Sequence, residues 1–264
     1  MKRTAIVSGA ASGIGAAVCE QLRHTGMRVI GIDLRHSDIC ADLSTQEGRA
    51  YAVDAALCLS ERRIDILVCC AGLGPQAEPV ASIASVNYFG VTALLDGLSG
   101  ALQAGCRASA VVVSSSSATL QAWDGNPLRQ AYLDGDESAV HAMLAALPPD
   151  LAPQAGFIAY ASSKNAVACA VRQRAASWGK AGVRLNAVAP GAVQTPLLEA
   201  GLADARYGEG IRNFVAPLST RARAEPADIA ALIGFIAGDS APFIHGSVLF
   251  ADGGIDAAMR PHHF

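Results

Sequence analysis

The chain has 264 residues, of which 52% are hydrophobic and 16% are charged, against about 25% charged residues in an average soluble domain. This composition excludes a disordered chain, because such chains combine low hydrophobicity with high net charge. The formal net charge of −3 provides no basic surface for nucleic acid or an anionic membrane. Seven cysteines, two of them adjacent, are typical of reduced thiols in a cytoplasmic protein, and we expect them to pack as small buried hydrophobes.

The N-terminal segment has the charge pattern of a secretory signal, because Lys2 and Arg3 precede the apolar run 4–19. Three glycines interrupt that run, however, and it lacks a Leu-rich centre. We therefore interpret it as a strand and a turn. No stretch of 18 strongly apolar residues occurs elsewhere, so we expect no membrane span.

Short β-branched runs alternate with longer helical patterns along the chain. The predicted strands are residues 3–8, 28–33, 64–70, 109–114, 183–189 and 247–251. The predicted helices are residues 13–25, 44–60, 79–105, 157–180 and 226–238. Such alternation is typical of a parallel sheet covered by helices on both faces. The sequence therefore predicts one α/β domain over residues 1–264, with a doubly wound, Rossmann-type parallel sheet.

The rhythm breaks at residues 118–156, a polar segment that contains prolines. Nearly 40 residues are too many for a simple connection. A disordered loop is one interpretation, but Ala139, Met143, Leu144 and Leu147 follow helical spacing on one stripe. We therefore predict a helical insertion, with a helix over residues 136–147.

The first predicted strand leads into Gly9-Ala10-Ala11-Ser12-Gly13-Ile14-Gly15. Glycines at these spacings let a backbone turn tightly and approach a pyrophosphate at a helix N-terminus. Asp33 follows twenty residues after Gly13, at the end of the second strand, where a carboxylate binds ribose hydroxyls and repels a 2′-phosphate. This pattern favours NAD over NADP, although Arg35 nearby leaves the opposite preference open.

Two further segments are candidates for contact with the adenosine part of NAD. Asp42 and Leu43 follow a short third strand, and Ala71 and Gly72 follow the fourth. The two histidines at 262–263 have no third ligand at a suitable spacing, so we expect no metal site.

Tyr160 and Lys164 are four residues apart, which places them on one face of a helix. Because the chain has only five tyrosines and three lysines, this spacing arises by chance in about 6% of such chains. A neighbouring ammonium group and a bound nicotinamide cation would lower the pKa of the phenol. Ser115, after the preceding strand, would hydrogen-bond the reacting oxygen, so that Ser115 and Tyr160 contact the substrate.

With these motifs in this order, the chain resembles the short-chain dehydrogenase/reductase family along nearly its whole length. The resemblance implies catalytic roles for Ser115, Tyr160 and Lys164, with Lys164 also binding the cofactor ribose, and for Asn87, which holds a proton-relay water. It implies cofactor contacts by Gly9, Ser12, Gly13, Ile14, Gly15, Tyr160, Lys164, Pro190, Gly191, Val193 and Thr195. Cys69 and Cys70 depart from the family pattern, which usually has two asparagines before Ala-Gly.

A narrower resemblance is to the bacterial 3α-hydroxysteroid dehydrogenase/carbonyl reductases of this family. It rests on residues 70–76, 85–90 and 252–256, and on the 44 residues that separate Ser115 from Tyr160. It implies an NAD-dependent enzyme that interconverts 3α-hydroxysteroids and 3-ketosteroids and reduces other carbonyls, with coniferyl and other aryl alcohols as alternative substrates. It also implies a homodimer formed through residues 226–251, because the insertion would cover the usual tetramer contact.

Alternative interpretations exist for residues 197–217 and for the function of the whole chain. Residues 197–217 follow Pro190-Gly191 and are either a surface helix or, as we prefer, a mobile lid over the substrate. The whole chain could also be a catalytically silent dinucleotide sensor. Sensors typically lose the tyrosine or the lysine, whereas this chain keeps both, so we expect an enzyme acting on a small molecule.

Overall fold

The computed structural model describes residues 2–218 and 220–263, and these form a seven-stranded parallel sheet with helices on both faces. The strands are β1 (Thr4–Ser8), β2 (Arg28–Asp33), β3 (Ile39–Cys40), β4 (Ile66–Cys69), β5 (Ser109–Val113), β6 (Arg184–Pro190) and β7 (Val248–Ala251). Their order across the sheet is β3-β2-β1-β4-β5-β6-β7. The predicted doubly wound α/β fold is thus confirmed, and β1, β4 and β5 read as continuous apolar runs because they are buried on both faces.

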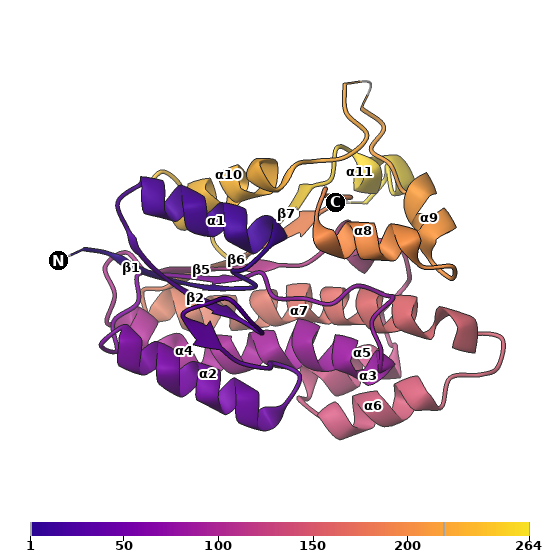
Figure 1. Cartoon of the computed structure of the whole chain (residues 1–264), viewed down its shortest axis with the longest axis horizontal. Helices are drawn as coiled ribbons and strands as arrows, with labels where there is room; N and C mark the ends of the chain where they lie inside the picture. Colours follow the sequence, from indigo (N-terminus) through magenta and orange to yellow (C-terminus); the bar gives the residue numbers. More distant parts are fainter. Residues whose placement is uncertain (1, 219, 264) are drawn as a thin grey trace.

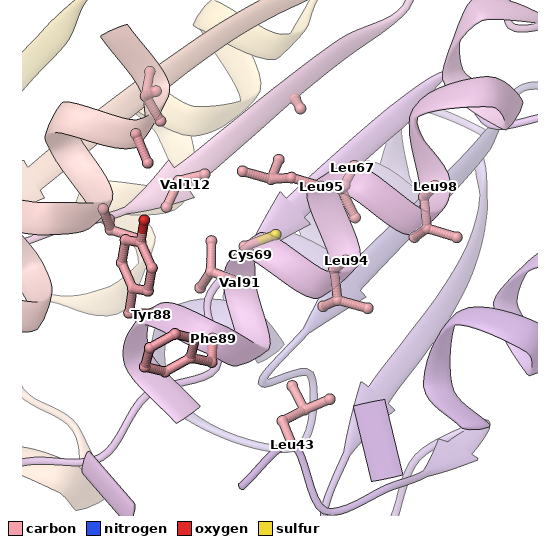
Figure 2. Close-up of a cluster of buried hydrophobic side chains, with 14 of the residues drawn as sticks. Leu43, Leu67, Cys69, Tyr88, Phe89, Val91, Leu94, Leu95, Leu98 and Val112 are labelled. Atoms are coloured by element: carbon pink, nitrogen blue, oxygen red, sulfur yellow. The ribbon is translucent and has the colours of Figure 1, made fainter. Parts of the chain in front are cut away.

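Two helical layers enclose the sheet (Figure 1). On one face lie α1 (Gly13–His24) and α10 (Pro226–Ala237), which pack on each other. On the other lie α2 (Gln46–Leu59), α4 (Val91–Gln103) and α7 (Ala155–Lys180). Each face has its own hydrophobic core, the larger beneath α2, α4 and α7. Figure 2 shows part of this larger core, where side chains of β4 and α4 meet.

The long helix predicted over residues 79–105 is three consecutive segments. An α-helical turn, α3 (Val80–Ala84), leads into a π-helical turn, η1 (Ser85–Gly90), and α4 follows without a break. Hydropathy alone could not find the π-turn, because one extra residue per turn shifts the apolar stripe only slightly. Asn87 lies in this turn.

The segment 118–156 contains two helices, α5 (Pro127–Leu133) and α6 (Glu137–Ala145). The 3₁₀ turns η2 (Ser116–Thr119) and η3 (Ala152–Gln154) flank them, and in Figure 1 α5 and α6 lie against the lower layer. The helix predicted over residues 136–147 is therefore present but shorter. Its predicted apolar stripe was partly wrong: Val140 and Leu144 are buried, whereas Met143 is exposed.

The C-terminal part supplies α8 (Pro196–Ala203), α9 (Gly208–Asn213) and α11 (Ile255–Met259). In Figure 1, α8 and α9 lie at the end of the sheet where the strands point, which is the carboxyl edge. No helix in the described residues 2–218 and 220–263 combines the length and the apolar character needed to cross a membrane.

Candidate active site

A cavity of about 1050 Å³ opens at the carboxyl edge of the sheet. Seventeen of the residues predicted from the sequence line it: Gly9, Ser12, Gly13, Ile14, Gly15, Asp33, Asp42, Leu43, Ala71, Gly72, Ser115, Tyr160, Lys164, Pro190, Gly191, Val193 and Thr195. Asn87 is the exception, because it lies behind Gly72 and does not line the cavity. The fold therefore brings residues from most of the chain to one place.

The turn between β1 and α1 is so compact that it requires glycine. Gly9 has a φ of +71°, and a Cβ atom there would lie 2.7 Å from the backbone nitrogen of Ala71. A Cβ on Gly15 would lie 2.0 Å from the carbonyl oxygen of Gly9. At Gly9 and Gly15 there is thus no room for a side chain. At this helix start the hydroxyl of Ser12 makes no capping hydrogen bond, so the cradle fits a pyrophosphate group.

The Asp33 carboxylate is held in a fixed orientation at the end of β2. One oxygen accepts a hydrogen bond from the backbone nitrogen of Ala11 at 2.9 Å, and the other accepts from that of Leu34 at 2.7 Å. Each carboxylate oxygen has a second lone pair, so the group can still accept hydrogen bonds from a ribose. Arg35 is exposed and is not among the residues that line the cavity. The geometry therefore fits an unphosphorylated ribose.

The two strands that border the cavity are tied together at their ends. The hydroxyl of Ser8, at the end of β1, accepts a hydrogen bond from the backbone nitrogen of Ala71 after β4 at 3.2 Å. Cys69 is packed in the core (Figure 2), and burial raises the pKa of its thiol to about 12. The expectation that all cysteines are buried was wrong, since Cys40, Cys58 and Cys106 are exposed; all seven are free thiols.

Tyr160 and Lys164 lie on α7, opposite Ser115 at the end of β5. The Lys164 ammonium group donates a hydrogen bond to the carbonyl oxygen of Val113 at 2.9 Å and lies 5.9 Å from the centre of the Tyr160 ring. In return, the hydroxyl of Ser114 donates to the Lys164 carbonyl oxygen at 2.7 Å. These reciprocal bonds fix the helix of the Tyr-Lys pair against the strand that carries Ser115.

Burial changes the acidity of both groups. It lowers the pKa of Lys164 to about 8, because the charged form loses its hydration. Burial raises the pKa of Tyr160, and a hydrogen bond with Ser115 offsets only part of that rise. Burial therefore outweighs the lowering of the Tyr160 pKa that was predicted from the neighbouring ammonium group.

The side chain of Asn87 joins the loop after β4 to α7. Its oxygen accepts a hydrogen bond from the backbone nitrogen of Leu73 at 2.8 Å. Its nitrogen donates to the Leu73 carbonyl oxygen at 3.1 Å and to the Ser163 hydroxyl at 3.3 Å. Asn87 is therefore linked to Lys164 through Ser163, the residue that precedes it.

The segment after β6 closes the other side of the cavity. The Thr195 hydroxyl caps α8 by accepting a hydrogen bond from the backbone nitrogen of Leu198 at 3.2 Å. The methyl group of Thr195 lies 3.0 Å from the position that a Cβ on Gly13 would take. The loop of Val193 and Thr195 thus lies beside the glycine turn.

Helices α8 and α9 cover the far end of the cavity, where the sequence predicted a lid. The Tyr207 hydroxyl accepts a hydrogen bond from the backbone nitrogen of Gly156 and donates to the carbonyl oxygen of Pro153, at 3.1 and 3.3 Å. Arg206 forms an ion pair with Glu78 at 2.6 Å. These bonds hold the lid segment over the cavity.

Sequence reasoning missed five of the residues that line this far end: Pro75, Gln76, Leu120, Pro153 and Phe157. The others, Leu197, Leu198, Tyr207, Ile211 and Phe214, lie in the segment 197–217 that was predicted to cover the substrate. The missed residues lie in loops, in η3 (Pro153) and near the start of α7 (Phe157), and their side chains follow no common period. Position after a strand end was the only signal that could have found them.

Fold and cavity define a dinucleotide-binding α/β protein, and comparison with known proteins identifies its family. Residues 3–131 match the family model "short chain dehydrogenase", and residues 150–256 match "Enoyl-(Acyl carrier protein) reductase". The chain is 48% identical over 259 residues, 98% of each chain, to the 3-alpha-hydroxysteroid dehydrogenase/carbonyl reductase of Comamonas testosteroni. The chain belongs to the short-chain dehydrogenase/reductase family. The part between the two models, residues 132–149, lies within the insertion.

Two other known proteins are similar to the chain over nearly its whole length. The crystal structure of the 3-alpha-hydroxysteroid dehydrogenase from Pseudomonas sp. B-0831 complexed with NADH is 49% identical, with a TM-score of 0.92, and the match covers 99% of this chain and 100% of that one. The cis-4-hydroxycyclohexanecarboxylate dehydrogenase of Sinomonas cyclohexanicum is 30% identical over 97% of both chains.

We predict that Asp33→Ala weakens NAD binding and relaxes discrimination against NADP. A hydrogen bond to a charged group contributes about 1.5–3 kcal/mol, so the dissociation constant for NAD should rise about tenfold to hundredfold. Steady-state kinetics and titration with both coenzymes measure the effect. Arg35→Ala is the matched control and should leave NAD binding unchanged. An unaltered coenzyme preference in Asp33→Ala would contradict this placement.

We also predict that Lys164 destabilises the fold at neutral pH. Its folded-state pKa of about 8 lies below its ordinary value of 10.5, so the cost of burying the charge is fully present below pH 8 and disappears above pH 10.5. One pKa unit corresponds to about 1.4 kcal/mol. The free energy of unfolding should therefore rise by on the order of 3 kcal/mol from pH 7 to pH 10.5, relative to the Lys164→Met variant.

Urea unfolding at both pH values measures this difference. Lys180, exposed at the end of the same helix, gives the matched control, and Lys180→Met should keep the full pH dependence of the wild type because it retains Lys164. A parallel pH response in wild type and Lys164→Met would show that the ammonium group is not desolvated.

Proposed function

We propose that the chain is an NAD-dependent dehydrogenase that interconverts a secondary alcohol and a ketone, with 3α-hydroxysteroids and 3-ketosteroids as its main substrates and carbonyl reduction as a further activity. The observation that carries the proposal is the convergence of Ser115, Tyr160 and Lys164 with the glycine turn on one cavity. The full-length similarity to hydroxysteroid dehydrogenases, one of them complexed with NADH, supports it.

The residues around the cavity fit NAD. The glycine turn and the start of α1 would hold the pyrophosphate, and Asp33 would accept hydrogen bonds from the adenosine ribose. Lys164 would hold the nicotinamide ribose, and the segment from Pro190 to Thr195 would contact the nicotinamide amide. Bound NAD supplies the acceptor for the hydride that leaves the carbinol carbon.

The chain's own residues would handle the proton and the orientation of the substrate. Ser115 would hold the substrate oxygen beside Tyr160, to which it is already hydrogen-bonded. In oxidation, the ionised Tyr160 would accept the hydroxyl proton, and in reduction the phenol would return it. The ammonium group of Lys164, together with the positive charge of the oxidised cofactor, would favour the phenolate. Asn87 would hold the water through which this proton reaches solvent.

The far end of the cavity favours a large apolar substrate. Its lining is dominated by leucine, isoleucine, proline and aromatic side chains, with the charge of Arg206 paired to Glu78. Such a surface binds a fused ring system by burial of apolar area. Within the described residues 2–218 and 220–263, no three His, Cys, Asp or Glu side chains gather in a way that could hold a metal ion.

The test of this function is the absorbance of NADH at 340 nm with a panel of steroid and aryl alcohols. We expect turnover with 3α-hydroxysteroids, and Tyr160→Phe should reduce it by at least about 100-fold because the proton acceptor is removed. The dissociation constant for NAD should stay within about twofold. A rate in Tyr160→Phe above a few per cent of wild type would contradict the assigned role.

Other results of the panel discriminate between functions. Turnover with aryl alcohols alone would make coniferyl-type alcohols the substrates. Silence across the whole panel, with NAD still bound, would favour a dinucleotide sensor. We also infer a cytoplasmic location, because all seven cysteines are free thiols.

We infer further that the chain forms a homodimer through α10 and β7. Strand β7 is an edge of the sheet, and an edge strand leaves backbone groups unpaired. Phe235, Phe243 and Phe250 are exposed in this region, Phe243 fully. Exposed aromatic groups beside an edge strand are typical of an association surface, and a twofold axis would let one patch cover its copy.

Light scattering should therefore give about twice the chain mass of 27.0 kDa. Phe243→Glu should give a monomer, because a carboxylate would be buried in the contact. Tyr51, a large exposed side chain on α2, provides the control, and Tyr51→Glu should leave the dimer intact. A mass near four chains would show that the insertion leaves a tetramer contact open.

A further inference from the structure

The position of Asn87 depends on an unusual piece of backbone. The π-turn Ser85–Gly90 lies between two α-helical segments of the same continuous run. A π-turn widens the helix by one residue and is less stable than an α-turn, so it persists where other contacts hold it. Contacts on both sides of Asn87 come from the insertion 118–156.

On the N-terminal side, the insertion holds Ser85. The Ser85 hydroxyl lies 2.9 Å from Nε2 of His141 on α6. The Ser85 carbonyl oxygen accepts a hydrogen bond from Arg49 of α2 at 3.4 Å, and Arg49 binds Glu137 of α6 through two hydrogen bonds, at 2.6 and 3.1 Å. The first residue of the π-turn is therefore held by a network that reaches α6.

This network depends on charge. The side chain of Arg49 is buried, and that of Glu137 is three-quarters buried. Burial alone would raise the pKa of Glu137, but hydrogen bonds from Arg49 and Ser85 outweigh it and lower that pKa below its ordinary value. Loss of the Glu137 charge would leave the Arg49 guanidinium buried without its partner, which is strongly unfavourable.

On the C-terminal side, the insertion packs against the two aromatic residues that follow Asn87. The ring centre of Tyr132 on α5 lies 5.1 Å from that of Tyr88 and 5.8 Å from that of Phe89. Figure 2 shows Tyr88 and Phe89 side by side in the core. Arg49 also lies over the Phe89 ring, at 6.0 Å from its centre, so the two sets of contacts meet.

We propose that the insertion positions Asn87 through the Glu137–Arg49 ion pair at Ser85 and through the Tyr132 contact. Glu137 is a positioning residue in this scheme, and it acts on the reaction only through Asn87. This inference rests on the role of Asn87 in the proposed function. It gives the insertion a part in catalysis that differs from its expected effect on assembly.

A double-mutant cycle tests whether Glu137 acts through Asn87. Glu137→Gln keeps the size of the side chain and removes its charge. We expect kcat to fall about tenfold, because displacement of a positioned group by a fraction of an ångström lowers the rate. The substrate KM and the dissociation constant for NAD should stay within about twofold. In the Asn87→Ala background, the same substitution should change kcat less than twofold, because the group it positions is gone.

Two further variants complete the design. Ser85→Ala removes only one hydroxyl, and it takes the place of Glu137→Gln in the cycle if that variant does not fold. We expect a smaller fall in kcat, which should again disappear in the Asn87→Ala background. Asp124→Asn is the matched control, because Asp124 is a fully exposed member of another ion pair of the insertion, with Arg129. It should leave kcat and KM unchanged. Titration of each variant with NAD measures the concentration of folded protein, so that kcat can be calculated per folded molecule.

The outcomes separate the two proposals. A normal kcat in Glu137→Gln, or an equal loss with and without Asn87, would overturn the positioning role while Asn87→Ala remains impaired. A normal kcat in Asn87→Ala would overturn the role of Asn87 and this inference with it. Loss of activity in Tyr160→Phe would still support the proposed function in either case.

Discussion

The structure depends on one close contact between two backbones, that of Gly9 at the end of β1 and that of Ala71 after β4. A Cβ on Gly9 would lie 2.7 Å from the Ala71 nitrogen, so no other residue lets these strand ends meet. β1 and β4 are neighbours in the sheet but not in the chain, and the chain leaves them toward opposite faces. The crevice that forms at such a point is where ligands bind in open α/β sheets.

The site on the other side of that crevice is built from buried polar groups that satisfy one another. Lys164 and Ser114 exchange hydrogen bonds with the backbone of the facing element. Asn87 uses its amide in the same way toward Leu73. Backbone carbonyls and amides cannot move away from these side chains, so the Tyr-Lys helix and the end of β5 form one rigid unit. Burial of the Lys164 ammonium group lowers the free energy of unfolding, and the same contacts fix the geometry of the site.

The sequence predicted the parts of the fold that follow simple periods. Strands such as β5 were found because buried parallel strands are continuous apolar runs, and the glycine turn was found because its spacing reflects backbone contact. The π-turn at Asn87 was not predicted, because the hydropathy of residues 79–105 does not distinguish a turn with i→i+4 hydrogen bonds from one with i→i+5 hydrogen bonds. The segment 197–217 was predicted to cover the substrate, but its two short helices were not predicted, because Asp204 and Arg206 lie between them and their apolar positions have no common period.

The site residues were predictable to the extent that one local pattern carries each of them. Tyr160 and Lys164 share a helical spacing, and Asp33 follows a strand end. The Arg49–Glu137 pair could not be predicted, because its two members lie 88 residues apart and belong to helices that meet only in the folded chain. Met143 was misplaced on α6 for a related reason, since which side of a nine-residue helix is buried depends on its neighbours.

The insertion 118–156 bears both on the turn that carries Asn87 and on the surface available for self-association. Its helix α5 packs on α7, and α6 packs on α3, so it covers part of the lower layer of the molecule in Figure 1. In the other layer, the aromatic side chains of Phe235, Phe243 and Phe250 are exposed near β7 and α10. The proposed bracing of the turn that carries Asn87 and the proposed dimer surface near β7 and α10 therefore involve opposite layers of the molecule. Both proposals depend on the packing of α5 and α6 against the lower layer.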